Sequence, residues 1–159
     1  MQLLKLYLDT SILSSYFDFY KPVRQLITQK WFSEEAGSFK LYISDLVITE
    51  VEAHPNEQIR NGLFELIKKQ KPTLLEITDD VIALASEYRQ LILKKEINDT
   101  IHLAAASLYS LDTIASWNFK HIVNISTMKA IHKCNLKHGL PLIEIVSLEN
   151  LGGFRYGNI

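Results

Sequence analysis

Three acids and one amide occupy positions in this sequence from which side chains could do chemistry together. Asp9 ends the apolar run LLKLYL, Glu50 lies in SDLVITEVE, Asp99 begins the apolar segment NDTIHLAAASLY, and Asn118 follows the run TIASW. Carboxylates that cluster repel one another and need a cation to compensate them. Oxygen ligands select Mg²⁺ or Mn²⁺ over Zn²⁺, and such ions orient phosphates, activate water and stabilise the charge of an in-line displacement. The four residues together therefore predict hydrolysis of phosphodiester bonds.

Each of the four also has an ordinary structural explanation when it is taken singly. Asp9 suits the N-cap of a following helix, and a carboxylate such as Asp99 is favoured at a helix start by the helix dipole. Glu50 fits a solvated helical side chain, whereas Asn118 fits a turn. The neighbouring Glu52 points to another side of the same helix. The functional interpretation gains weight because the four residues lie on separate elements.

Strand-like runs alternate with helical segments along the chain. The runs cover residues 3–8, 40–44, 73–78, 113–117 and 142–147. Strands that alternate with helices predict a parallel sheet covered on both faces, which is a three-layer α/β domain. In such sheets the functional crevice lies at the carboxyl ends of the strands, where the strand order reverses. Asp9 and Asn118 each follow a strand, so we expect their side chains at that edge.

The helical segments carry apolar stripes. Val23, Leu26, Ile27 and Trp31 recur at helical spacing after a proline that suits a first turn, so they predict one face of a buried helix. Asn56 is placed to cap the N-terminus of a later helix.

The composition is that of an ordinary globular domain. The chain has 159 residues, a formal net charge of −1 and 47% hydrophobic residues, so we expect one domain with a buried core. A net charge near zero argues against strong binding to nucleic acid by the field alone, although a basic patch beside an acidic pocket would cancel in the sum. Cys134 is the single cysteine, so we expect a packing role for it, no disulfide framework and no Cys-based zinc site. Neither a signal peptide nor a membrane span is evident, so a cytoplasmic protein is expected.

Four segments of the chain, LYLDTSIL, ISDLVITEVE, INDTIHLAAA and IASWNFKHIVN, resemble those of PIN domains of the VapC type, in the family's order. These are ribonuclease toxins of bacterial and archaeal toxin–antitoxin pairs. The resemblance implies an RNase H-like fold with a five-stranded parallel sheet of order 3-2-1-4-5. It also implies a single PIN-like domain over residues 1–151, followed by a C-terminal tail at 152–159.

The resemblance further implies a metal site for Mg²⁺ or Mn²⁺. Its ligands would be Asp9, Glu50 and Asp99, with Asn118 as a catalytic residue where many PIN domains carry a fourth acid. This departure removes one negative charge, which implies weaker metal affinity or a single firmly held ion. Ser116, two residues earlier, is placed to supply a hydroxyl to the same site.

Further polar residues could support this site. Thr10 and Ser11 could cap the next helix and offer hydroxyls to whatever Asp9 holds. His102, three residues after Asp99, is more often a satisfied core histidine than a ligand. Residues that could contact RNA phosphates are Lys120, His121, Lys129 and Lys133, the last two on a basic helix face.

The leading hypothesis is a metal-dependent endoribonuclease, the toxin of a type II toxin–antitoxin pair. As the resemblance implies, an antitoxin protein would cover the crevice, and the chain would form a homodimer that does not contact membranes. The alternative is a catalytically weak or inactive PIN-fold module that binds RNA or protein, which Asn118 favours. A response-regulator domain needs an acidic pair after the first strand, and a phosphatase of the haloacid dehalogenase type needs an acid where Ser11 stands. Both of these patterns fit badly.

Overall fold

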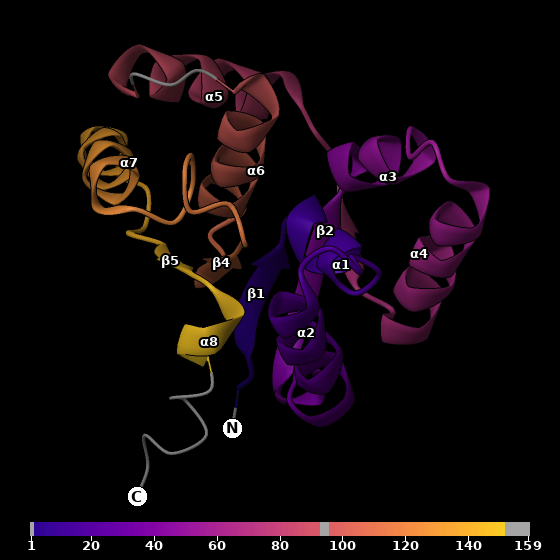
Figure 1. Ribbon diagram of the computed structural model, residues 1–159. Coiled ribbons are helices and arrows are strands. Elements are labelled where there is room, and N and C mark those ends of the chain that lie inside the picture. Colours follow the sequence, from indigo (N-terminus) through magenta and orange to yellow (C-terminus); the bar gives the residue numbers. More distant parts are fainter. Residues whose placement is uncertain (1, 93–95, 152–159) are drawn as a thin grey trace, which may run out of the picture.

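The computed structural model describes residues 2–92 and 96–151, and a parallel five-stranded sheet runs through their centre (Figure 1). Its strands are β1 (Leu4–Leu8), β2 (Phe39–Ser44), β3 (Thr73–Leu75), β4 (Thr113–Ala115) and β5 (Glu144–Val146). Their order, β3-β2-β1-β4-β5, confirms the predicted order 3-2-1-4-5. The predicted tail at 152–159 lies outside the described residues.

The strand order reverses between β1 and β4, which lie side by side at the centre of the sheet. Leu6 pairs with Thr113 and Leu8 with Ala115. The strands β2 and β3 lie on one side of β1, and the strands β4 and β5 lie on its other side. The residues that follow β1 and β4 therefore meet at the switch point where ligands bind in open α/β sheets.

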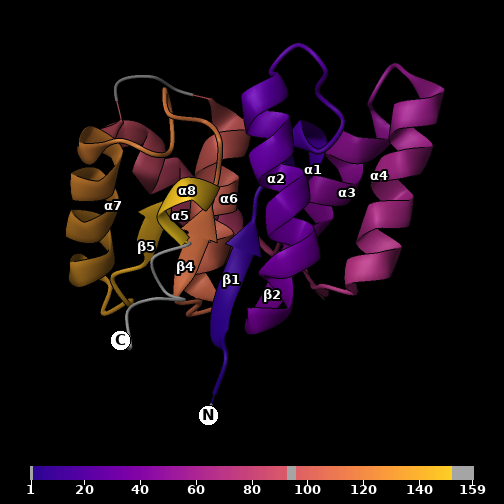
Figure 2. The ribbon, with the colours of Figure 1, turned by 60° about the horizontal axis from the view of Figure 1, so that its bottom comes forward.

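Helices cover both faces of the sheet, as the three-layer prediction requires (Figures 1 and 2). One face carries α1 (Thr10–Ser15), α2 (Pro22–Glu34), the short 3-10 turn η1 (Ala36–Ser38), α3 (Asp45–Glu52), α4 (Glu57–Gln70) and α8 (Leu148–Leu151). The other carries α5 (Asp79–Leu91), α6 (Ile97–Leu108) and α7 (Ile125–Lys137). No helix of the described residues is long and apolar enough to cross a membrane.

The alternation of side chains along β1 divides the interior into two cores. Tyr7 points into the core beneath α5, α6 and α7, whereas Leu6 and Leu8 point into the core beneath α1 to α4. All three side chains are at most 1% exposed. Successive residues of a strand face opposite sides, so the part of β1 that is covered on both sides, residues 6–8, is built from large, mainly apolar side chains.

Side-chain caps set the starts of several helices. Asn56 accepts a hydrogen bond from the backbone N–H of Ile59 at 3.0 Å, which confirms its predicted role. Asp9 caps α1 by accepting from the N–H of Ile12 at 3.3 Å, so the cap is the acid itself and not Thr10.

The apolar stripe predicted for α2 is wrong in its first half. Val23 and Leu26 are 71% and 66% exposed, whereas Trp31 is buried. The face turned toward the protein carries Thr28, whose hydroxyl accepts a hydrogen bond from the indole Nε1–H of Trp117 at 3.0 Å. Because this buried donor requires a polar partner, the helix presents Thr28 inward and leaves the two apolar side chains in solvent.

A buried asparagine connects the helices of the second face. Asn135 of α7 accepts a hydrogen bond from the hydroxyl of Tyr88 on α5 at 2.5 Å. Its amide donates to Ser107 Oγ of α6 at 3.0 Å and to the carbonyl of Pro141 at 2.9 Å. One fully buried side chain thus links three helices and the segment before β5.

Replacing Asn135 with alanine is expected to lower the free energy of unfolding by about 2–3 kcal/mol, because it leaves several buried polar groups unpaired. The matched control is the neighbouring Leu136→Ala, at a side chain that is 68% exposed, for which we expect a change below about 0.5 kcal/mol. Urea denaturation followed by tryptophan fluorescence measures both. Equal losses in the two variants would contradict the role given to Asn135.

Candidate active site

Asp9 lies at the switch point and is almost entirely buried, with 3% of its surface exposed. Its Oδ1 accepts a hydrogen bond from the Ser11 hydroxyl and its Oδ2 accepts one from the Ser116 hydroxyl, each at 2.5 Å. Burial raises the pKa of the Asp9 carboxyl above its ordinary value, while the charge of His102 and the serine hydroxyls oppose that shift. The hydroxyls predicted at residues 11 and 116 therefore reach the acid and stabilise its charge.

Glu50 projects from α3 toward the same edge and is held by two donors on one oxygen. Its Oε1 accepts hydrogen bonds from Thr10 Oγ1 and from His102 Nε2, both at 2.7 Å. Burial acts to raise the pKa of Glu50, but the hydrogen bond and charge of His102, with Thr10 and Asn98, hold it below its ordinary value. Glu50 is consequently ionised at neutral pH, whereas the adjacent Glu52 is exposed as expected.

His102 belongs to a chain of hydrogen bonds that the sequence did not reveal. Its Nδ1 lies 2.6 Å from the hydroxyl of Tyr7, which in turn lies 2.7 Å from Ser44 Oγ. The histidine is buried, as a core residue would be, yet its Nε2 contacts Glu50. Its position three residues after Asp99 was the one sequence signal for this role. Tyr7, held protonated by a raised pKa that burial causes, thus connects β1 and β2 to Glu50 through His102.

Asp99 lies half-buried in the first turn of α6, and the pKa of its carboxyl is raised. Burial, and then the negative charge of Asp9, raise its pKa from 3.8 to about 6, against the opposing influence of His102 and His121. Its Oδ2 accepts a hydrogen bond from Asn118 Nδ2 at 3.0 Å. The amide N–H of Asn118 therefore points to the Asp99 carboxyl group. An acid in place of Asn118 would have repelled that group.

Asn118 also organises the loop after β4. Its Oδ1 accepts the backbone N–H of His121 at 3.0 Å, and its own N–H donates to Ser116 Oγ at 2.9 Å. The oxygen is thus used within the loop, and the turn chemistry expected of an asparagine is combined with a contact to Asp99.

Two cavities that share Asn118 open at this edge of the sheet. The first has a volume of about 540 Å³ and is lined by Glu50, Glu96, Ile97, Asn98, Asp99, Asn118 and His121. The second has a volume of about 500 Å³ and is lined by Ser11, Ser14, Ser15, Asp18, Lys21, Arg24, Trp117, Asn118, Phe119 and Lys120. His121 therefore lines the first cavity and Lys120 lines the second. Lys129 and Lys133, also predicted to contact RNA, line a different cavity beside α5 and α7.

The wall of the second cavity contains a stacked arginine. The guanidinium carbon of Arg24 lies 5.0 Å from the centre of the Trp117 ring and 5.7 Å from that of Phe119. Phe119 is 45% exposed, so an aromatic face and a positive charge stand together beside Asn118.

The oxygen donors of the first cavity fit a hard divalent cation. Glu50 and Asp99 line it directly, and Asp9 lies near enough to raise the pKa of Asp99. That crowding is the condition that a bound cation relieves. Among the described residues, however, the one group of three His, Cys, Asp or Glu side chains whose ligand atoms all lie within 4.8 Å of one another is Glu87, Cys134 and His138, away from this edge.

The fold and the acidic edge define a parallel α/β domain with its site at the β1–β4 switch point. The family profile of the PIN domain matches residues 6–119, a span that contains Asp9, Glu50, Asp99 and Asn118. The chain belongs to the PIN domain family. No curated protein matches it.

Solved structures of toxin–antitoxin proteins share this fold. VapBC2 from Rickettsia felis, bound to a promoter DNA fragment, is 12% identical with a TM-score of 0.56, covering 91% of this chain and 98% of that one. VapC20 from Mycobacterium tuberculosis, a sarcin–ricin loop cleaving toxin, is 11% identical with a TM-score of 0.59, covering 72% and 91%. A toxin–antitoxin complex from Klebsiella pneumoniae is 21% identical with a TM-score of 0.58, covering 77% and 93%. Together with the family match, these neighbours confirm the resemblance to VapC-type PIN domains.

Replacing Asp99 with asparagine is expected to stabilise the metal-free fold at pH 8. Because the folded-state pKa of Asp99 is raised from 3.8 to about 6, the wild-type fold loses stability as the pH rises through that window, and the variant does not. The gain should be about 1 kcal/mol above pH 7, since solvent screens a half-exposed group, and absent below about pH 4. Urea denaturation in EDTA at several pH values measures it.

Glu50→Gln is the matched variant, and its expected effect on the stability of the fold has the opposite sign. The pKa of Glu50 is lowered, so its carboxylate stabilises the fold at neutral pH, and the loss on substitution should fade as the pH falls through the folded-state pKa. An Asp99→Asn protein that is less stable than wild type at pH 8 would contradict the electrostatic account.

Proposed function

We propose that this chain is a Mg²⁺- or Mn²⁺-dependent endoribonuclease that hydrolyses RNA phosphodiester bonds, and that it is the toxin of a type II toxin–antitoxin pair. The observation that carries the proposal is the convergence of Glu50 and Asp99 on one cavity, above the buried Asp9, at the switch point of the sheet. The family match and the toxin neighbours support the same class of activity.

Each acid has a partner that sets its position in this proposal. Ser11 and Ser116 hold Asp9, His102 and Thr10 hold Glu50 Oε1, and Asn118 holds Asp99 Oδ2. A Mg²⁺ or Mn²⁺ ion held by the three acids would supply Lewis-acid stabilisation of the phosphate and an activated water.

Asn118 would contribute to substrate binding through its remaining hydrogen. One of its two amide hydrogens is directed to Asp99, which leaves the second for a phosphate oxygen. In this arrangement Asn118 would orient a phosphate oxygen, which gives a concrete form to its predicted role as a catalytic residue.

The second cavity is the better candidate for holding RNA beside the acids. Arg24, Phe119 and Lys120 offer positive charge and an aromatic face next to Asn118. Positively charged side chains bind the phosphate backbone, and an exposed aromatic ring can stack on a base of any identity. Lys129 and Lys133 lie in the other cavity, so their predicted contact would require RNA to extend over α7.

A protein partner is proposed on the evidence of both surface and neighbours. Phe19, Tyr20, Val23 and Leu26 are each at least 66% exposed around the start of α2, and exposed apolar side chains that are this close in the sequence support an interaction site there. One structural neighbour is a toxin–antitoxin complex, and another is VapBC2 bound to a DNA fragment of its promoter. We propose that this chain binds an antitoxin protein, forms a homodimer and is located in the cytoplasm.

A second candidate function is a PIN-fold module that binds RNA or protein with weak catalysis or none. The amide of Asn118 favours it, because an oxygen that accepts from the His121 backbone is not offered to the cavity and one negative charge is missing.

Purified protein is expected to cleave a mixed RNA pool in Mg²⁺ or Mn²⁺ and not in EDTA. Asp9→Asn and Asp99→Asn should each lower the cleavage rate by at least about a hundredfold, because charge stabilisation worth several kcal/mol is lost. Gel analysis of RNA fragments gives the rates, and circular dichroism checks that the variants fold.

Asn118→Asp separates the two candidate functions. A wild type that is inert while Asn118→Asp cleaves in a metal-dependent way would support the weak module and assign its weakness to residue 118. Cleavage by wild type that neither EDTA nor Asp99→Asn affects would exclude the proposed site.

Phe119→Ala is expected to weaken binding of single-stranded RNA in EDTA by about five- to a hundredfold, equivalent to the loss of one stacked base. Lys120→Ala should weaken binding evenly across sequences and lower the salt slope by about 1. Lys129→Ala, an exposed lysine of the other cavity, is the control and should change little. Fluorescence anisotropy measures all three, and a loss confined to Lys129→Ala would favour the α7 face instead.

A further inference from the structure

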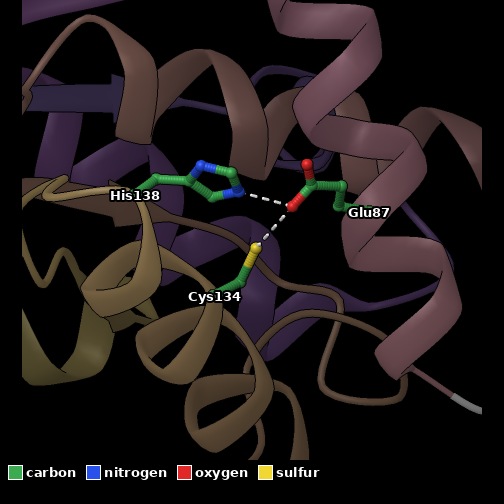
Figure 3. Close-up of side chains that lie close together, drawn as sticks. All are labelled: Glu87, Cys134 and His138. Atoms are coloured by element: carbon green, nitrogen blue, oxygen red, sulfur yellow. Dashed lines mark hydrogen bonds and ion pairs between the residues drawn. The ribbon is translucent and has the colours of Figure 1, made fainter.

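Glu87, Cys134 and His138 come together where α5 lies beside α7 (Figure 3). Cys134 and His138 are four residues apart, on α7 and at its C-cap, so they share one side of the helix end. Glu87 reaches them from α5. Its Oε2 accepts hydrogen bonds from His138 Nε2 at 2.5 Å and from Cys134 Sγ at 3.5 Å.

The spacing of the three ligand atoms is close to that of a metal site. In a tetrahedral site, zinc bond lengths place sulfur, nitrogen and oxygen ligands about 3.3–3.6 Å from one another. The sulfur and the carboxylate oxygen are already 3.5 Å apart, and all three atoms lie within 4.8 Å of one another. The nitrogen and oxygen must separate by about 0.8 Å. The side chains of His138 and Glu87 are 36% and 41% exposed, so both have room to adjust.

Two hydrogens lie between these side chains, one on Cys134 Sγ and one on His138 Nε2. A divalent cation could take the place of both. The thiol and the imidazole donate to the same carboxylate oxygen, so replacing their protons with a divalent ion keeps the same three groups converging. With the thiol deprotonated, the carboxylate and thiolate carry two negative charges that match a divalent ion.

Solvent reaches the cluster through the cavity that Glu87 and Cys134 line, whose volume is about 1060 Å³. Lys129, Lys133 and Lys137 line the same cavity. Their positive charges oppose cation binding, so we expect weaker binding than in a closed four-ligand zinc site.

We propose that Glu87, Cys134 and His138 bind a Zn²⁺ ion that clamps α7 to α5, with water in the fourth position. On binding, the S–H bond of Cys134 breaks, a sulfur–zinc bond forms, and the thiol proton leaves to solvent. The Nε2–H bond of His138 breaks as the nitrogen–zinc bond forms, and the imidazole exchanges that proton with solvent so that it carries its remaining hydrogen on Nδ1. Thiolate and imidazole ligands select zinc over Mg²⁺, so this site and the carboxylate edge would take different metals. The proposal departs from the expectation, drawn from the sequence, of a packing role for Cys134 and no Cys-based zinc site.

Cobalt titration tests the site directly, because a Co²⁺–thiolate bond produces a charge-transfer band in the near ultraviolet. Cys134 is the single cysteine of the chain, so such a band reports on this cluster alone. Reduced wild-type protein should show the band, Zn²⁺ should displace it, and Mg²⁺ should not. Cys134→Ser should abolish it, and His138→Gln and Glu87→Gln should each weaken cobalt binding by more than about tenfold.

Asp99→Asn is the matched control, since it alters the carboxylate edge and should keep the band unchanged. Thermal unfolding provides a second readout: Zn²⁺ should raise the Tm of the wild type by about 2–4 °C and leave that of His138→Gln unaffected. The proposal is overturned by the absence of a band in folded, reduced wild type. It is equally overturned by cobalt binding of equal strength in wild type, His138→Gln and Glu87→Gln.

Discussion

The burial of the Asp9 carboxyl group is the constraint on which the arrangement of the site depends. A carboxylate taken out of water costs several kcal/mol unless hydrogen bonds replace its hydration. Here the replacement comes from Ser11 at the start of α1 and from Ser116 directly after β4. Because the two hydroxyls belong to parts of the chain that flank the switch point, the hydrogen bonds that satisfy this one carboxyl group also tie the end of β1 to the end of β4.

The other two acids experience opposite environments at the same edge. Glu50 is kept ionised by His102, which Tyr7 of the sheet contacts through its hydroxyl. Asp99 is pushed toward its protonated form by burial and then by the negative charge of Asp9. Environments that drive neighbouring carboxyl groups apart in pKa are typical of catalytic sites. The environment of Asp99 also stores unfavourable free energy in the ligand-free fold, which is the general cost of building a site.

The sequence predicted the features that depend on local pattern and missed those that depend on distant partners. Apolar runs located the strands, and their ends located Asp9 and Asn118, while the strand order came from the family resemblance. The orientation of α2 was mispredicted because Trp117, 89 residues away, decides that Thr28 faces inward. His102 in an apolar helix looks like any core histidine until Glu50 is known to stand beside it. The outermost residues of the cluster around Cys134, Glu87 and His138, are 51 positions apart, so no short sequence motif contains all three ligands.

The pairing of Asp9 with Ser116 joins residues that are 107 positions apart. No short stretch of the polypeptide contains the acids together with the groups that hold them. In a growing chain that has not yet reached β4, Asp9 and Glu50 are dispersed, hydrated side chains with ordinary acidity. The crevice therefore comes into existence late in biosynthesis, and a prematurely terminated product would carry the acids without the geometry. For a protein with the proposed activity, only complete and folded molecules would carry an active site in the cell.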